Sequence, residues 1–239
     1  MADRSPVHVP PSSSISGETR PGWPEVAVGL LVFALIGFGG GSQLWRLGLD
    51  PVVNGLIFAA LSGIAGMAGF AAAAALLRIG SWRAFGVCAT SRRWLLIGAG
   101  AGLAAFFVKG FAIMAYVALT GQDSNPQEIY ATGASGGVLS VILATFFLGI
   151  ITPIGEEFLF RGVVTTVLLR YGAFVGVVGG ALLFALMHGI NMVLPAALVA
   201  GLVAGDVYRR SGSIWPAVMV HSVFNLPAIP VMVLARTAQ

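Results

Sequence analysis

Six polar side chains interrupt apolar stretches in the second half of the chain, and their types suit hydrolytic chemistry. They are Glu156, Glu157, Arg161, His188, His221 and Asn225. Two imidazoles and a carboxylate are a familiar minimum for binding a divalent metal such as zinc. A carboxylate near such a centre can take a proton from water, and an amide or imidazole N–H can stabilise an oxyanion. The set therefore indicates one site where water attacks a carbonyl group.

The spacing of these residues agrees with helices. Glu157 and Arg161 are four residues apart and can pair on one helical face, whereas Glu156 points about 100° away toward a different partner. His221 and Asn225 are also four residues apart, so they share a face. Taken singly, these groups have simpler explanations: an interfacial charge pair, a hydrogen-bonded histidine and a polar contact between helices. Their joint occurrence favours a site.

The composition shows which elements must position these side chains. The chain is 57% hydrophobic and 9% charged, and its mean hydropathy is +0.92, whereas a soluble domain has roughly 25% charged residues. The solvent for most of the chain must therefore be lipid. We predict an all-α fold, a polytopic transmembrane bundle of seven to eight spans with an intramembrane polar cavity. The formal charge of +4 is small, and we expect no nucleic-acid partner.

Apolar runs of bilayer-spanning length fill the chain after its first 22 residues, since a bilayer needs about 20 apolar residues per helix. Residues 1–22 are polar and rich in Ser and Pro, which predicts a disordered tail, and 23–239 form the transmembrane domain. The stretch 158–169 either extends the fourth span as one long helix or forms a separate interfacial helix. The predicted spans are 25–45, 52–78, 94–119, 137–155, 172–189, 193–208 and 214–235.

Arginine placement predicts the orientation of the spans. The connections at 79–93 and 209–213 are basic, and the connection at 120–136 has acidic residues and no basic one. Basic connections stay on the cytoplasmic side, so the N-terminus should lie inside and the C-terminus outside.

A seven-span count creates a conflict, because it places Glu156 near the cytoplasmic face and His188 toward the outer one. These side chains can meet only if 137–169 is one long or broken helix that carries Glu156 to the middle of the membrane. The fifth span must then be tilted or offset as well.

Two features of the first half concern packing and binding. Gly37, Gly39, Gly40 and Gly41 cluster at the end of the first span, which indicates close helix packing. Lys109 lies within the third span. It either lines the cavity and meets a substrate carboxylate, or it snorkels or pairs structurally.

The strings EEFLFR, FALMH and HSVFN resemble the three motifs of the CPBP family, which comprises CAAX prenyl proteases and bacteriocin-processing membrane proteases and is also called the Abi family. The family pattern is Glu-Glu-x-x-x-Arg, then Phe-x-x-x-His, then His-x-x-x-Asn or Asp. All three occur here in order. Each motif alone is weak, but the ordered triplet in separate membrane segments is specific. The resemblance covers about residues 137–235.

The resemblance implies an intramembrane metalloendopeptidase. Glu156 and His188 would activate the hydrolytic water, and His221 and Asn225 would hold the water or metal and stabilise the oxyanion. A divalent metal, most simply zinc on His188 and His221, is implied for a metalloprotease. The substrate would be a membrane-associated peptide or protein in the lipid bilayer, and we expect a prokaryotic plasma membrane.

Supporting roles follow from the same resemblance. Glu157 and Arg161 would brace the helix, or Glu157 would assist Glu156, and Phe184 would pack beside the site. Two alternatives belong to other classes. One is a non-catalytic membrane protein of the same fold that acts in binding or in bacteriocin self-immunity. The other is a small proton-coupled transporter with a Glu/His relay.

Overall fold

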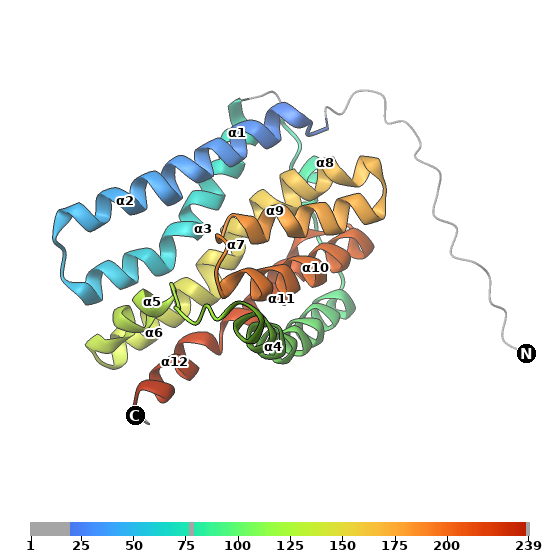
Figure 1. Cartoon of the computed structure of the whole chain (residues 1–239). Coiled ribbons are helices and arrows are strands. Elements are labelled where there is room, and N and C mark those ends of the chain that lie inside the picture. Colours follow the sequence, from blue (N-terminus) through green and yellow to red (C-terminus); the bar gives the residue numbers. More distant parts are fainter. Residues whose placement is uncertain (1–19, 77–78, 238–239) are drawn as a thin grey trace, which may run out of the picture.

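A computed structural model describes residues 20–76 and 79–237, and these ranges contain helices and no strand (Figure 1). The predicted tail at 1–22 lies outside the described residues except for 20–22. The α-helices are α1 (Trp23–Ala34), α2 (Gly41–Leu44), α3 (Pro51–Leu76), α4 (Arg92–Thr120), α5 (Glu128–Gly133), α6 (Val138–Phe146), α7 (Thr152–Glu157), α8 (Thr166–Leu168), α9 (Gly180–Leu186), α10 (Val193–Ser211), α11 (Ile214–Asn225) and α12 (Ala228–Thr237).

Short segments of other helix types join several of these helices into longer rods. The π-helical segments are Leu35–Gly40, Phe147–Ile151, Phe158–Thr165 and Val175–Gly179. The 3₁₀ turns are Trp45–Leu47, Trp82–Phe85, Ala134–Gly136 and Leu169–Tyr171.

Five of the described helical rods are long and apolar enough to cross a membrane, which confirms an all-α polytopic membrane bundle. They are Trp23–Leu47, Pro51–Ala74, Arg92–Thr120, Val138–Tyr171 and Ile214–Arg236. The predicted spans at 172–189 and 193–208 are not among these five: the first contains the shorter apolar helix Val175–Leu186, and the second is α10.

The fourth rod is one continuous helix of 34 residues, Val138–Tyr171. Of the two alternatives for the stretch 158–169, the long helix is therefore confirmed. Pro153 lies inside this helix, where proline lacks an N–H and its ring crowds the carbonyl four residues earlier. A π-helical segment, Phe147–Ile151, ends just before Pro153 and widens the turn at that point. We call the rod Val138–Tyr171 the long helix.

Glycines allow α3 to cross the long helix with the two backbones in contact. A methyl group added to Gly155 would overlap the carbonyl oxygen of Gly63, and one added to Gly66 would overlap the carbonyl of Gly155. The close packing predicted for the glycines at 37–41 is wrong for Gly39 and Gly40. A methyl group at either position would meet nothing within 4 Å in the described part of the chain.

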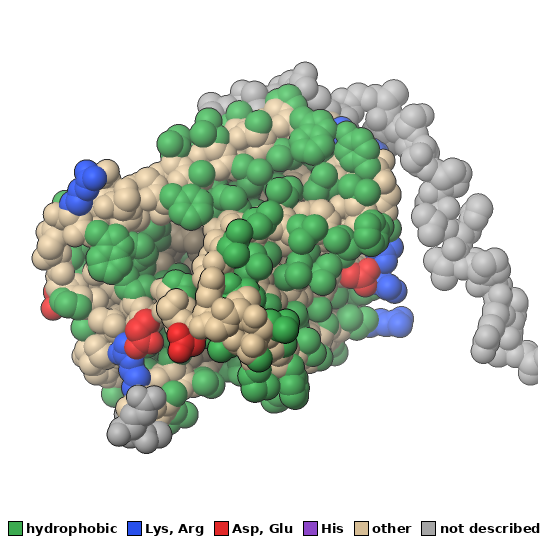
Figure 2. Space-filling model, viewed as in Figure 1, with side chains coloured by type: hydrophobic (Ala, Val, Ile, Leu, Met, Phe, Trp, Pro, Cys, Tyr) green, Lys and Arg blue, Asp and Glu red, His purple; other side chains and the backbone are tan. Residues whose placement is uncertain are grey.

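The two basic connections meet at one end of the bundle. The backbone N–H of Ile214 donates to the Gly86 carbonyl at 3.0 Å, and the Ser213 hydroxyl donates to the Cys88 carbonyl at 2.8 Å. This contact agrees with the prediction that both connections lie on the same side of the membrane. Figure 2 shows charged side chains toward the two ends of this face, with hydrophobic side chains across the middle.

Candidate active site

A cavity of about 630 Å³ brings the four predicted catalytic residues to one space inside the bundle. Glu156, His188, His221 and Asn225 all line it. The other walls include residues of α1, α3, α4, α5, α10 and α12, and most of their lining side chains are apolar. Residues that are far apart in the sequence therefore share one pocket.

The lengths of the helices explain why these side chains meet. Glu156 lies near the midpoint of the long helix, which is 34 residues long. The helix Val175–Leu186 extends only about 18 Å at 1.5 Å per residue, and the apolar core of a bilayer is roughly 30 Å thick. His188 follows this short helix directly, and a helix of this length does not carry it across the apolar core of a bilayer. The conflict in the seven-span count is resolved in this way.

Glu156 faces the cavity with an acceptor atom that the protein leaves unpaired. Its side chain is almost fully buried, and Oε2 has no hydrogen-bond partner among the described residues. Oε2 lies 3.8 Å from Nε2 of His221, which is too far for a direct hydrogen bond. The side-chain amide of Asn225, one turn further along α11, donates to the Leu148 carbonyl at 3.2 Å. The carboxylate is thus free to bind another donor.

Glu157 points away from the cavity into a closed cluster of charges. Its Oε2 lies 2.8 Å from Nε of Arg161, and its Oε1 accepts from Arg161 Nη2 at 3.2 Å. His221 Nδ1 lies 2.9 Å from the same Oε1. A carboxylate paired with arginine only accepts, so Nδ1 of His221 carries the proton and donates. The lone pair of His221 Nε2 then faces Glu156.

His188 is oriented by backbone contacts on its own side of the cavity. Its Nδ1 lies 2.9 Å from the Phe184 carbonyl, which can only accept, so Nδ1 is protonated and Nε2 carries the lone pair. The Asn191 amide donates to the His188 carbonyl at 2.8 Å and fixes the turn. Phe184 packs edge-on against both imidazoles, with centroids 4.8 Å from His188 and 5.6 Å from His221.

Among the further polar side chains that line the same cavity, Lys109 and Tyr130 are the two that can carry a charge. Lys109 reaches it from α4, as one alternative for this residue predicted. Tyr130 reaches it from α5, and sequence reasoning missed it because no motif or spacing distinguishes this tyrosine. Loss of hydration raises the pKa of Tyr130 to about 12, and the negative charge of Glu156 raises it too. The hydroxyl therefore stays protonated and can donate.

The donor set does not fit a resident metal ion in this arrangement. In residues 20–76 and 79–237, no group of three or more His, Cys, Asp or Glu side chains is placed to hold one. The two imidazoles could supply one nitrogen ligand each, Nε2, because each Nδ1 already has a partner. The prediction of zinc on His188 and His221 stays a prediction.

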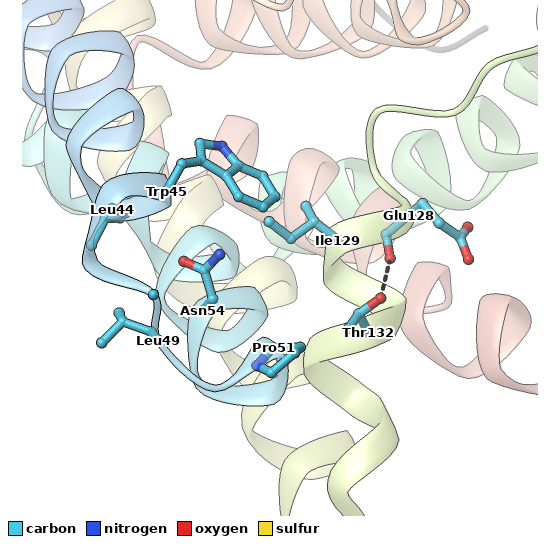
Figure 3. Close-up of a pocket in the computed structure, with 9 residues that line it drawn as sticks. Leu44, Trp45, Leu49, Pro51, Asn54, Glu128, Ile129 and Thr132 are labelled. Atoms are coloured by element: carbon cyan, nitrogen blue, oxygen red, sulfur yellow. Dashed lines mark hydrogen bonds between the residues drawn. The ribbon is translucent and has the colours of Figure 1, made fainter.

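A second, smaller cavity of about 330 Å³ lies between the α2–α3 connection and α5. Figure 3 shows Trp45, Asn54 and Thr132 around it, with the Thr132 hydroxyl bonded to the backbone carbonyl of Glu128. None of the predicted catalytic residues lines this pocket. The larger cavity is therefore the candidate active site.

Comparison with known protein families adds an independent observation. Residues 137–227 match the family model described as "Type II CAAX prenyl endopeptidase Rce1-like". No curated protein and no solved structure matched the chain. The matched segment runs from the start of α6 to just beyond α11, so it includes all three motifs and all four predicted catalytic residues. Residues 137–227 are therefore similar to the Rce1-like type II CAAX prenyl endopeptidases, which agrees with the resemblance to the CPBP family that the three motifs indicated.

Proposed function

We propose that the protein is an intramembrane endopeptidase in which Glu156 activates water to hydrolyse a peptide bond of a membrane-associated peptide or protein. One observation carries the proposal: Glu156 Oε2 is buried in the cavity wall, has no protein partner among the described residues and lies 3.8 Å from His221 Nε2. A general base needs an acceptor of this kind within reach of its water.

The proposed reaction begins with one water bound between two acceptors. Glu156 Oε2 and His221 Nε2 are spaced so that the two protons of one water can point to both. Glu156 takes a proton as the water oxygen attacks the carbonyl carbon, which leaves a tetrahedral oxyanion. Glu156 then gives the proton to the leaving nitrogen as the C–N bond breaks, so the carboxylate is regenerated.

The charge cluster behind the site has a positioning role in this proposal. Glu157 accepts the Nδ1 proton of His221, and its ion pair with Arg161 fixes the position of Glu157. A histidine that is oriented by a carboxylate presents one defined tautomer to its substrate. Glu157 and Arg161 therefore determine the orientation of the lone pair that holds the water.

Asn225 and His188 complete the proposed site. The Asn225 amide has two N–H groups, and one of them donates to Leu148, so the other is available for the oxyanion. Nε2 of His188 carries a lone pair and is an alternative to His221 Nε2 as the acceptor for the second proton of the water. Removing one oxyanion donor typically lowers kcat by roughly 100- to 1,000-fold.

The substrate class follows from where the cavity lies. Its lining is mainly apolar, and it opens among helices long enough to cross a bilayer. A peptide that reaches it must come from the membrane or its surface, which fits the family of membrane proteases that the chain matches. Residence in a prokaryotic plasma membrane remains a prediction.

The test is hydrolysis of a peptide library by purified protein in lipid nanodiscs. Wild type is compared with Glu156→Gln and with His188→Ala, each with and without a metal chelator. We expect wild type to cleave selected peptides with or without chelator, and both variants to lose most of the activity. Equal cleavage by Glu156→Gln would refute the proposal, and loss on chelation with recovery by zinc would replace the metal-free step with a zinc-dependent one.

A further inference from the structure

We propose that Lys109 binds a carboxylate of the peptide substrate and thereby selects which bond reaches Glu156. The inference rests on the proposed function, because it assigns a recognition residue to the same cavity. It concerns a side chain outside the matched segment 137–227 and outside all three motifs.

The contacts of Lys109 hold its ammonium group in place without neutralising it. Nζ donates to the Phe224 carbonyl at 3.1 Å and lies over the rings of Phe106 and Phe224, 4.4 Å and 4.3 Å from their centroids. No carboxylate of the described chain lies within salt-bridge distance of it. An ammonium has three N–H groups, so two remain for a ligand.

Lys109 differs from the other basic residues of the chain in type and in surroundings. Lys109 is the only lysine in the sequence, and the remaining basic residues are arginines. Arg161 is also within an apolar rod, but Glu157 neutralises it completely. A cation inside a membrane is costly and is retained where it pairs or functions. Among the described lysines and arginines, Lys109 is the one that lines the cavity. A partner from outside the chain would balance its charge.

The position of Lys109 limits where the substrate carboxylate lies. Phe224, its carbonyl partner, is three residues from His221 along α11, or about 5 Å along the axis. With about 3 Å added for a hydrogen bond, a carboxylate on Nζ lies on the order of 6–10 Å from the water between Glu156 and His221. Extended chain covers about 3.3–3.6 Å per residue, so the carboxylate belongs about two to three residues from the cleaved bond.

Two structural roles compete with this proposal. Lys109 can serve only to satisfy a carbonyl at the end of α11, where the last four carbonyls lack helical partners. It can also act only as a distant counter-charge for Glu156. Neither role gives the enzyme a preference for charged over neutral peptides, so substrate charge distinguishes them from carboxylate binding.

The experiment compares three peptides with the same cleavable sequence, whose cut bond lies two to three residues from the C-terminus. One has a free C-terminal carboxylate, one has a C-terminal amide, and one has the amide with an Asp side chain at that distance from the cut bond. KM and kcat are measured for wild type, Lys109→Met, Lys109→Arg and Val108→Ala. Val108 is the matched control, because it adjoins Lys109, is half-exposed and does not line the cavity.

We expect wild type to prefer a carboxylate peptide over the neutral one by roughly tenfold or more in KM, as for a hydrogen bond to a charged group. Lys109→Met should abolish the ratio, Lys109→Arg should keep part of it, and Val108→Ala should keep it in full. The source of the carboxylate is the main chain if only the free acid is preferred, and a side chain if only the Asp peptide is.

Binding to the Glu156→Gln protein separates this inference from the proposed function. Fluorescent acid and amide peptides are titrated onto Glu156→Gln and onto the Glu156→Gln/Lys109→Met double variant. Equal affinity for both peptides in the single variant overturns carboxylate binding even if wild type cleaves peptides. A carboxylate preference that depends on Lys109 supports it even if wild type cleaves none, in which case only the proposed hydrolysis fails.

Discussion

Two adjacent glutamates of the long helix have opposite surroundings. Glu157 is fully buried and has partners for its carboxylate in Arg161 and His221. Glu156 is also buried, but it faces the cavity with an unpaired Oε2. One residue turns the side chain by about 100°, which is enough to move a carboxylate from a charge cluster to the wall of a cavity. The two residues are of one type, so only their surroundings distinguish the proposed general base, Glu156, from the proposed positioning residue, Glu157.

The closed cluster and the open cavity are joined by His221. Its Nδ1 belongs to the cluster and its Nε2 belongs to the cavity. A change in the cluster should therefore reach the cavity through one imidazole ring, whereas a change at Glu156 should leave the cluster intact. The following predictions test this asymmetry.

Glu156→Gln should have the largest effect. Loss of a general base lowers the rate by about 10²- to 10⁴-fold, so we expect a fall of this size in kcat/KM. The free energy of unfolding should change by less than about 1 kcal/mol, since Glu156 Oε2 has no hydrogen-bond partner among the described residues. Peptide hydrolysis and thermal unfolding in nanodiscs measure the two quantities. A strongly destabilised Glu156→Gln would contradict the proposed difference between Glu156 and Glu157, because it would give Glu156 a structural role.

Arg161→Met should mainly affect stability. It leaves the charge of Glu157 buried and unpaired, which typically lowers the free energy of unfolding by roughly 3–5 kcal/mol. The double variant Glu157→Gln/Arg161→Met removes that charge and should recover much of the loss. Denaturant titration of both proteins checks this. If the double variant is no more stable than the single one, the cluster is not held by charge pairing.

Gly155→Ala should have an intermediate effect, because its methyl group overlaps the backbone of α3 at Gly63. Overpacking of this kind usually costs about 1–3 kcal/mol, and the shift should also displace the neighbouring Glu156 and lower activity. Gly39→Ala is the matched control, since nothing described lies within 4 Å of the added methyl. Equal melting temperatures for the two variants would argue against the close crossing.

Tyr130→Phe should have the smallest effect, a change of less than about tenfold in kcat/KM. The pKa of Tyr130 is about 12, so its hydroxyl stays neutral at lower pH and does not shape the pH–rate profile below about pH 9. Wild type and Tyr130→Phe should give curves of the same shape in that range. A basic limb that disappears in the variant would show that this tyrosine titrates during catalysis.

The sequence predicted the membrane class and the grouping of the polar residues because both depend on local patterns. Hydropathy identifies apolar rods, and four-residue spacing places Glu157 beside Arg161 and His221 near Asn225. The predicted pairing of Glu157 with Arg161 is present in the structure. The family match covers the segment that the motifs indicated.

Features that depend on contacts between distant segments were harder to predict. The glycines at 37–41 form a denser cluster than Gly63 and Gly155, but the latter pair makes the backbone contact. A cluster of glycines shows only that one helix has a smooth stretch. A close crossing also needs a second helix whose own small residues lie opposite that stretch. Tyr130 was missed for the same reason, because only the three-dimensional fold brings it to Glu156.

Glycine contacts also determine which part of the protein can move when a peptide substrate binds. Gly98 and Gly102 press the first half of α4 against the backbone of α11, and Ala105 is the last buried residue of α4. Beyond Ala105 no residue of α4 is buried, and this part is held by fewer contacts, among them the hydrogen bond from Lys109 to the Phe224 carbonyl and the packing of Ile113 against the core. We expect this part of α4 to move more than the segment bearing Glu156 when a substrate enters, because that segment packs backbone to backbone against α3.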